Sequence, residues 1–206
     1  MSDTPANSLP QTLPIFPLQI VLFPASRLSL RIFEARYMDM VATCMREESE
    51  FGVCLIVEGQ EVGTPAVPHK VGVSARVVDW DMSQPGLLGI TVRGMRRFRI
   101  VEHRADTQGL VRAAVRWLDE APATALSATH QQLVPLLQAV AADGGAKVMP
   151  PPHHFDDPSW IGYRYAEILP IPPLARQRLL ELDDPVMRLD IIQQFLGDRG
   201  LLKPAG

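Results

Sequence analysis

The sequence contains few cysteines, few lysines and no long apolar run. Cys44 and Cys54 are the two cysteines among 206 residues. Neither has a metal-type partner at short spacing, so we expect two reduced, buried thiols. No stretch approaches the roughly 18 continuous apolar residues of a membrane helix, and the N-terminus lacks the apolar core of a signal peptide. These absences exclude a disulfide scaffold and predict a cytoplasmic protein with no membrane partner.

The charge of the chain is close to balanced and slightly acidic. Lysine and arginine total 20, aspartate and glutamate total 23, and the formal net charge is -3. Proteins that bind nucleic acid through general electrostatic attraction carry a basic excess. The composition therefore argues against nucleic acid as a general partner.

Sequence motifs of the common enzyme classes are missing. The chain contains no GxxxxGK[ST] phosphate loop, no GxSxG nucleophile elbow and no HExxH zinc motif. The three lysines, Lys70, Lys147 and Lys203, lie in loop or tail contexts, whereas a nucleophilic lysine needs a desolvated pocket. We therefore expect no enzyme activity, no catalytic residue and no cofactor.

One cluster of side chains could bind a metal ion. His153, His154, Asp156 and Asp157 offer imidazole and carboxylate groups, which are zinc ligands. Adjacent histidines on an extended segment point in opposite directions, however, and Asp157 also suits the N-cap of a helix. We expect a solvated loop and no metal site here.

The two halves of the chain differ in their pattern of apolar residues, glycine and proline. Residues 9–119 form short apolar runs broken by Gly and Pro, which is typical of strands and turns. After them come apolar-periodic segments punctuated by proline. We expect a disordered tail over 1–8, a β domain over 9–120, a helical subdomain packed on it over 121–200, and a second tail over 201–206.

Within the first half we expect several short antiparallel strands and one helix. The helix is predicted from Glu34 to about Glu48. Pro14 and Pro17 cannot donate to a sheet ladder, so their strand is expected to lie at an edge or to break at a bulge. The expected strands are 51–57, 73–80, 87–93, 96–103 and 110–118. Pro85 and Gly86 suit a type II turn, and a loop slightly longer than two residues is expected there.

Proline also marks the helices of the second half. Asp157-Pro158 and Asp184-Pro185 each place an N-cap residue before a proline at the first helical position. A further helix is expected after Pro173. A helix over 126–142 is expected to kink or split at Pro135 and to end at Gly144-Gly145.

Arginines and tryptophans are the remaining candidates for binding. The basic run comprises Arg93, Arg96, Arg97, Arg99 and Arg104. Strand alternation splits this run between two faces, which favours a solvated, ion-paired face over an RNA-binding patch. Trp80, Trp117 and Trp160 are expected in the core or at its edge, with a ligand-binding role as the alternative.

Taken in order, a set of short motifs resembles the N-terminal domain of the Lon protease family. The motifs are LPIFPL (Leu13 to Leu18), VLFP (Val21 to Pro24), LRIFEARY (Leu30 to Tyr37), FGV from Phe51, VGT from Val62, LLGITVRG (Leu87 to Gly94), RFR (Arg97 to Arg99), ILPIPP (Ile168 to Pro173) and LLELDDP (Leu179 to Pro185). The resemblance covers the chain from Leu13 to Gly197. It departs from the family pattern at Ala25-Ser26, where a glycine often follows the FP pair, and at Pro65 and Pro68.

The resemblance implies an α+β fold: a small β-barrel or rolled antiparallel sheet of the pseudouridine-synthase-and-archaeosine-transglycosylase-like (PUA-like) type with one helix, followed by a C-terminal helical bundle. It also implies a binding function, because in Lon proteases ATP hydrolysis and proteolysis belong to later domains. The implied partners are unfolded or apolar protein segments, with a full-length Lon-type protease as a further candidate. The sequence specifies no oligomeric state.

The IFEARY motif and nearby residues form the candidate binding or structural signature. Phe33 and Tyr37 are expected on one helical face, with Glu34 in the first turn and Arg36 able to reach a sheet edge or an acidic partner. A structural lock between helix and barrel and a substrate contact are both compatible with this pattern. Trp80, Arg93 and Arg97 complete the set.

Two functions therefore compete at the level of sequence. The first is a module that binds unfolded or apolar segments and acts as an adaptor or regulator of proteolysis. Such binding is expected to be weak and nearly independent of salt. The second is RNA binding, since PUA-like folds also occur in RNA-binding proteins, and fold alone does not decide function. A clustered face of Arg93, Arg97 and Arg99 would favour RNA.

Overall fold

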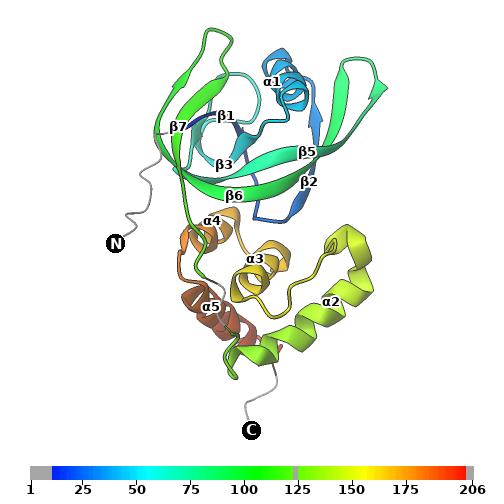
Figure 1. Ribbon diagram of the computed structural model, residues 1–206, viewed down its shortest axis with the longest axis vertical. Helices are drawn as coiled ribbons and strands as arrows, with labels where there is room; N and C mark the ends of the chain where they lie inside the picture. The colour runs from blue at the N-terminus through cyan, green and yellow to red at the C-terminus, as the bar shows by residue number, and fades with distance from the viewer. Residues whose placement is uncertain (1–10, 123–124, 203–206) are drawn as a thin grey trace, which may run out of the picture.

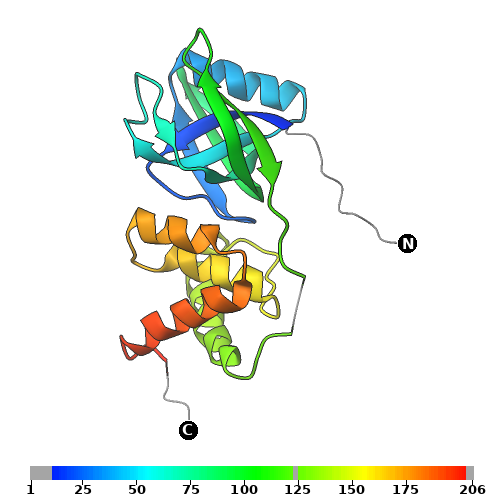
Figure 2. The ribbon, with the colours of Figure 1, turned by 90° about the vertical axis from the view of Figure 1, so that its left-hand side faces the viewer.

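The computed structural model describes residues 11–122 and 125–202, which form a β-barrel stacked on a group of helices (Figures 1 and 2). The strands are β1 (Gln11–Leu18), β2 (Arg27–Ile32), β3 (Phe51–Glu58), β4 (Val67–Pro68), β5 (Val71–Gln84), β6 (Leu87–Ala105) and β7 (Val111–Trp117). The helices are α1 (Ala35–Arg46), the short 3₁₀ helix η1 (His130–Gln132), α2 (Leu133–Val148), α3 (Pro158–Ile168), α4 (Pro173–Glu181) and α5 (Pro185–Gly197). The expected α+β fold is confirmed. The tail over 1–8 and most of the tail over 201–206 lie outside the described residues.

Strand pairing closes the sheet into a barrel. The strand order is β1-β7-β6-β5-β3, and β3 returns to pair with β1. That last pairing is parallel, whereas the neighbours along the order pair antiparallel. Because the sheet closes, none of these five strands is an edge strand along its whole length. Most backbone N–H and C=O groups are therefore paired and cannot pair with another chain. Short β4 pairs with β3, and β2 pairs with the first half of β6.

The hairpin of β5 and β6 differs from the sequence expectation. Gln84 pairs directly with Leu87, so Pro85 and Gly86 form a two-residue turn, and the expected longer loop is wrong. Gly86 has φ 79°, the conformation that glycine adopts without steric cost. The two strands expected over 87–93 and 96–103 are one strand of 19 residues. Register shifts along β6 let this strand bend around the barrel without a break.

The position of β1 also corrects an expectation. It is not an edge strand, because it pairs with β7 over residues 11–15 and with β3 over residues 15–18. Each proline nevertheless lies where β1 has one strand partner: Pro14 is paired only with β7 and Pro17 only with β3. The missing N–H of each proline is therefore compatible with a barrel strand.

A loop after Phe23 approaches β6 unusually closely at Gly94. Ala25 N–H donates to Gly94 O at 2.8 Å, and Gly94 N–H donates to Ser26 O at 2.9 Å. A Cβ at Gly94 would lie 2.1 Å from Phe23 O, so only glycine fits. Ala25 itself has φ 63°, a left-handed conformation that costs an L-residue roughly 1–2 kcal/mol. Glycine adopts this conformation without steric cost, which explains why a glycine often follows the FP pair in the family pattern, where this chain has Ala25.

Helix α1 covers one end of the barrel. Tyr37, Met40, Val41 and Cys44 are buried on its inner face, and the ring of Phe16 stacks on that of Tyr37 with centroids 4.1 Å apart. The helix begins at Ala35, one residue after the expected start. Burial of this apolar stripe is the main reason the helix stays on the sheet.

The C-terminal helices begin where the sequence predicts. Asp157 caps α3 by accepting the Ser159 N–H at 2.8 Å, and Asp184 caps α5 by accepting the Val186 N–H at 2.8 Å. The segment expected to be one helix over 126–142 is split into η1 and α2, and Pro135 lies in the first turn of α2, where a missing N–H is tolerated. The helical backbone breaks at Gly145, whose φ of 57° is not helical, close to the end expected at Gly144-Gly145.

A buried polar network joins the barrel to the helices. Arg97 of β6 is fully buried, and its guanidinium contacts Glu120, Asp183 and the carbonyls of Leu180 and Leu182. Arg188 of α5 is also fully buried and donates to the Leu179 and Leu182 carbonyls. Arg164 of α3 donates to Pro24 O at 2.7 Å, and Gln177 of α4 donates to Val71 O at 3.0 Å. Arg97, Arg164 and Gln177 each link a helix to the barrel, whereas Arg188 links α5 to the end of α4. The domain boundary near residue 120 stays a prediction.

Within the part of the chain that the structure describes, no helix is both long and apolar enough to cross a membrane.

Candidate functional site

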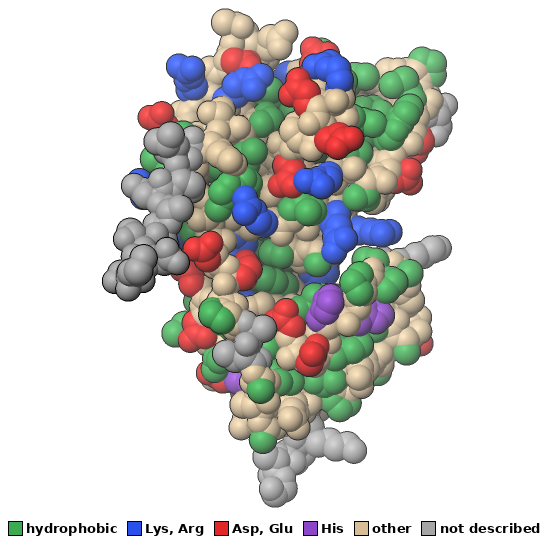
Figure 3. Space-filling view, in the orientation of Figure 1, with side chains coloured by type: hydrophobic (Ala, Val, Ile, Leu, Met, Phe, Trp, Pro, Cys, Tyr) green, Lys and Arg blue, Asp and Glu red, His purple; other side chains and the backbone are tan. Residues whose placement is uncertain are grey.

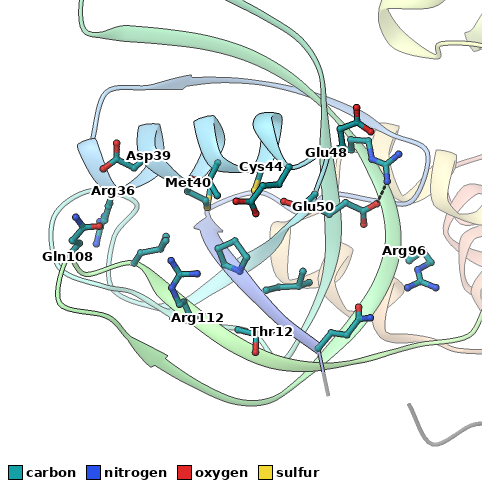
Figure 4. Close-up of a pocket in the computed structure, with 18 of the residues that line it drawn as sticks. Thr12, Arg36, Asp39, Met40, Cys44, Glu48, Glu50, Arg96, Gln108 and Arg112 are labelled. Atoms are coloured by element: carbon teal, nitrogen blue, oxygen red, sulfur yellow. Dashed lines mark hydrogen bonds and ion pairs between the residues drawn. The ribbon is translucent and has the colours of Figure 1, made fainter. Parts of the chain in front are cut away.

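A groove of about 780 Å³ lies between α1 and the strands β1 and β7 (Figure 4). Its walls come from segments far apart in the sequence, which the barrel brings together. The lining residues are Gln11, Thr12, Leu13, Pro14, Arg36, Asp39, Met40, Thr43, Cys44, Glu47, Glu48, Ser49, Glu50, Arg76, Arg96, Gln108, Leu110, Arg112 and Trp117. We take this groove as the candidate site.

One wall of the groove is acidic. Asp39 and Thr43 of α1 and its C-cap residue Glu47 are spaced four residues apart, so they form one stripe along the helix. Glu48 and Glu50 extend this wall in the connection to β3. Asp39 and Glu48 make no ion pair with any residue that the structure describes. Their carboxylates are therefore available to a cationic group.

The opposite wall carries the basic groups. The Arg96 guanidinium lies over the ring of Trp117, 4.1 Å from its centroid, and Trp117 donates its indole N–H to the Gln11 side chain at 2.9 Å. Arg112 contacts Asp106 at 3.3 Å. Figure 4 shows Arg112 below α1 and Arg96 beyond Glu50. Glu50 pairs with Arg76 at 2.9 Å. The groove is thus polarised, with carboxylates on the helix side and guanidiniums on the strand side.

The floor of the groove is apolar but offers little exposed surface. Leu13, Met40, Cys44 and Leu110 are each at most 7% exposed. Burial raises the pKa of the Cys44 thiol, so it remains protonated and unreactive at neutral pH. A ligand in this groove would meet charged walls and strand backbone before it met apolar side chains.

The IFEARY residues lock α1 to its surroundings. Arg36 is buried and donates to Gly109 O at 2.8 Å while contacting Glu34 at 2.9 Å. Tyr37 is buried and stacks on Phe16. The expectation that Phe33 and Tyr37 share a helical face is wrong, because Phe33 precedes the helix and is 56% exposed. Of this motif, only Arg36 lines the groove.

Trp80 lies away from the groove, near the β5–β6 hairpin. Its expected place in the core or at its edge is wrong, because Trp80 is 56% exposed. Met82, two residues on, is 52% exposed. These two side chains form a small exposed apolar surface, a second place where a protein segment could bind. Trp160 is buried as expected, and Trp117 lies at the core edge.

The structure does not bring Arg93, Arg97 and Arg99 together on one exposed face. Arg97 is buried in the network between barrel and helices, whereas Arg93 and Arg99 are exposed. Strand register instead aligns Arg93 with Arg27 of β2 and Arg76 of β5. This row of three arginines was not visible in the sequence, because it depends on pairing between three strands. On the face in Figure 3, acidic and basic side chains are interspersed over the barrel.

A serine, a histidine and an aspartate converge on the helical side. Ser127 Oγ lies 3.0 Å from His130 Nδ1, and His130 Nε2 lies 2.7 Å from Asp190 Oδ1. The same Ser127 oxygen accepts the His130 backbone N–H at 3.2 Å, which is the geometry of a helix cap. The contacts tie the start of η1 to α5. The sequence search found no such convergence, because Asp190 lies far from the other two residues along the chain.

The histidine cluster expected to be a solvated loop packs partly against aromatic rings. His153 and His154 lie about 6 Å from the ring of Trp160, centroid to centroid. His153 also contacts the Met149 carbonyl at 3.0 Å. Among the described residues, no group of three or more His, Cys, Asp or Glu side chains is placed to hold a metal ion.

Comparison with known proteins identifies the family. Residues 12–198 match the family described as the ATP-dependent protease La (LON) substrate-binding domain. The chain belongs to this family. A crystal structure of a Lon N-terminal domain protein from Xanthomonas campestris is similar to it at 36% sequence identity and a TM-score of 0.75, covering 91% of this chain and 98% of that one.

A more distant solved structure agrees with the Lon-type fold. The N-terminal domain of a Lon protease from the Mycobacterium avium complex aligns with a TM-score of 0.64 at 20% identity, covering 91% of this chain and 99% of that domain. A search of curated proteins found no match. The resemblance drawn from the motifs is confirmed, and the chain is a Lon-type substrate-binding module. The family match includes neither an ATPase nor a protease domain.

Proposed function

We propose that this Lon-type module binds flexible segments of unfolded proteins in the groove between α1, β1 and β7. The observation that carries the proposal is the match to the Lon substrate-binding domain over residues 12–198. In the cytoplasm the module would act as an adaptor or regulator of proteolysis, and a full-length Lon-type protease is the proposed partner in that role.

The groove changes the expected character of the binding. The sequence suggested an apolar surface and little dependence on salt, but the walls carry carboxylates and guanidiniums over a buried apolar floor. Exposed charge pairs are screened by salt. We therefore expect weak binding, with a dissociation constant on the order of 10 µM or weaker, and a moderate loss of affinity as salt rises.

Fluorescence anisotropy with a labelled, reduced and unfolded casein peptide tests this function. The expected result is saturable binding that weakens by about two- to fivefold between low and high salt, as for a few screened charge pairs. Absence of binding at protein concentrations roughly tenfold above the expected constant would contradict the proposed function.

RNA binding is the second candidate, and the row of Arg27, Arg93 and Arg76 favours it. Like charges directly opposite on neighbouring strands repel each other, and an anion would relieve that repulsion. Glu50 already pairs with Arg76 at 2.9 Å, which leaves two arginines of the row for a phosphate. A labelled RNA that binds with a steep salt slope, and loses affinity on Arg93→Glu, would establish this function in place of the first.

We also propose that the protein has no catalytic activity. Ser127, His130 and Asp190 resemble a nucleophile–base–acid set, but the serine oxygen serves as a helix cap and the histidine links two helices. Pure protein is expected to hydrolyse neither ATP nor unfolded casein, and Ser127→Ala is expected to lower thermal stability without changing any turnover. Turnover that co-purifies with the wild type and disappears in Ser127→Ala would contradict this.

A further inference from the structure

We propose that the groove holds its protein segment by strand addition: an extended polypeptide pairs through its backbone with the open edge of β1 at residues 11–14. This inference rests on the proposed function and specifies how the groove would recognise its ligand. In strand addition, main-chain hydrogen bonds supply much of the affinity, and side chains on the two sides of the added strand supply selectivity.

The first support is a gap in the pairing of the barrel. β1 pairs with β7 over residues 11–15, but with β3 only over residues 15–18. The edge of residues 11–14 that points toward β3 therefore has no strand partner among the described residues. No backbone hydrogen bond from another described segment fills this gap. An unpaired strand edge presents N–H and C=O groups to any extended chain that fits beside it.

The second support is that this edge faces the groove. Gln11, Thr12, Leu13 and Pro14 all line it. Successive side chains of a strand point to opposite faces, so four consecutive lining positions mean that the backbone itself faces the cavity. β3 begins at Phe51 and reaches β1 at Gly52. An added strand would thus occupy the place that β3 would take if it began a few residues earlier.

The dimensions of the groove suit a short extended segment. Asp39 to Glu47 spans about 12 Å along α1, at 1.5 Å per residue. Four strand residues span about 13 Å at most. The two walls therefore match in length, and the groove accommodates about four residues of extended chain. Pro14 has no N–H, and only alternate residues point to one edge, so about two or three hydrogen bonds can form.

The charges of the walls define the occupant. Asp39 and Glu48 on the helix side have no ion-pair partner among the described residues, whereas Arg96 and Arg112 lie on the strand side. The occupant is a flexible protein segment that carries basic and acidic side chains and has no proline at the pairing positions. A nucleic acid has no peptide N–H groups to pair with β1, and its phosphates would be repelled by the acidic wall.

Two tryptophan variants on α1 test whether the segment occupies the groove. Thr43 lines the groove, whereas the neighbouring Ala42 is exposed and does not. The probe is a labelled peptide of about twelve residues with Val and Tyr alternating with Lys and Glu, a pattern that favours extended chain. Thr43→Trp is expected to weaken probe binding at least about tenfold, and Ala42→Trp is expected to leave it unchanged. Equal melting temperatures would show that both variants are folded.

N-methylated probes test the strand addition itself. Methyl groups on alternate backbone nitrogens block the hydrogen bonds on one side of an extended chain and leave the other side free. Of the two alternating methylation patterns, one is expected to abolish binding and the other to preserve it. A different outcome is that Thr43→Trp abolishes binding of the parent probe while both N-methylated probes bind the wild type as well as the parent probe does. In that case strand addition is wrong, but binding in the groove is still supported. If the parent probe does not bind the wild type, the proposed function fails as well.

A second copy of the chain is the alternative occupant of the β1 edge. Analytical ultracentrifugation of the wild type and of Thr43→Trp distinguishes it. The proposal predicts the same sedimentation for both proteins in the absence of probe. A wild-type dimer that Thr43→Trp converts to a monomer would overturn the proposal.

Discussion

Replacing Arg97 with methionine is expected to destabilise the protein by about 2–4 kcal/mol, because buried and half-buried acceptors lose a charge-assisted donor. The Arg97 side chain is fully buried and donates to Glu120 at 2.8 Å and to the Leu180 and Leu182 carbonyls at 3.0 and 3.1 Å. Its loss leaves the Leu180 carbonyl and one Glu120 oxygen without this donor, whereas the Leu182 carbonyl still accepts from Arg188. Burial raises the pKa of the Tyr163 hydroxyl, which therefore stays protonated and donates to Glu120, but it cannot replace a guanidinium.

Denaturant unfolding of Arg97→Met measures this effect, and Arg99→Met is the matched control. Arg99 lies two residues further along β6 and is exposed, so its replacement should change the free energy of unfolding by no more than about 0.5 kcal/mol. Because Arg97 joins β6 to the helical part, we also expect the variant to expose the interface between the two parts. An Arg97→Met protein as stable as Arg99→Met would show that the network does not hold them together.

Replacing Gly94 with alanine is the second substitution with a large expected effect. The new Cβ would lie 2.1 Å from the carbonyl oxygen of Phe23, a backbone atom that cannot move without breaking the hydrogen bonds of the loop to β6. Forced overpacking of a tight contact costs about 1–3 kcal/mol, and loss of the hydrogen bonds adds to it. We expect a drop of at least about 2 kcal/mol in the free energy of unfolding.

Gly89→Ala on the same strand is the control for this prediction. There a Cβ would lie 2.9 Å from the Asp81 carboxylate, and a side chain can shift at less cost than the backbone carbonyl at Gly94. The change is expected to be neutral or slightly stabilising, since alanine reduces the freedom of the unfolded chain. Thermal melts of the two variants check the contrast, and equal melting temperatures would contradict the steric argument at Gly94.

Local signals in the sequence predicted the local structure well. The caps at Asp157 and Asp184 were predictable because each involves an aspartate and an N–H two residues later. The expectations that were wrong depended on tertiary context. Pro14 and Pro17 suggested an edge strand, whereas β1 changes its partner from β7 to β3 between them. The bend of β6 around the barrel likewise follows from pairing with three other strands.

The candidate site was harder to predict than the fold. Its walls come from α1, β1 and β7, and no local motif links Thr43 to Thr12 or to Arg112. The signature residues that the sequence did supply mostly hold the fold: Arg36 and Tyr37 fix α1, and Arg97 joins the two parts. The family motifs therefore predicted the architecture of this Lon-type module more directly than its binding surface.

An NMR titration of ¹⁵N-labelled protein with an unlabelled, unfolded casein peptide tests most directly whether protein segments bind in the groove between α1, β1 and β7, because each backbone amide reports on its own surroundings. We expect the amides of Thr12, Leu13, Thr43 and Glu47 to shift together and saturate, while the Trp80 indole stays unchanged. Shifts confined to Trp80 and the β5–β6 hairpin, with the groove amides unmoved, would contradict binding in the groove.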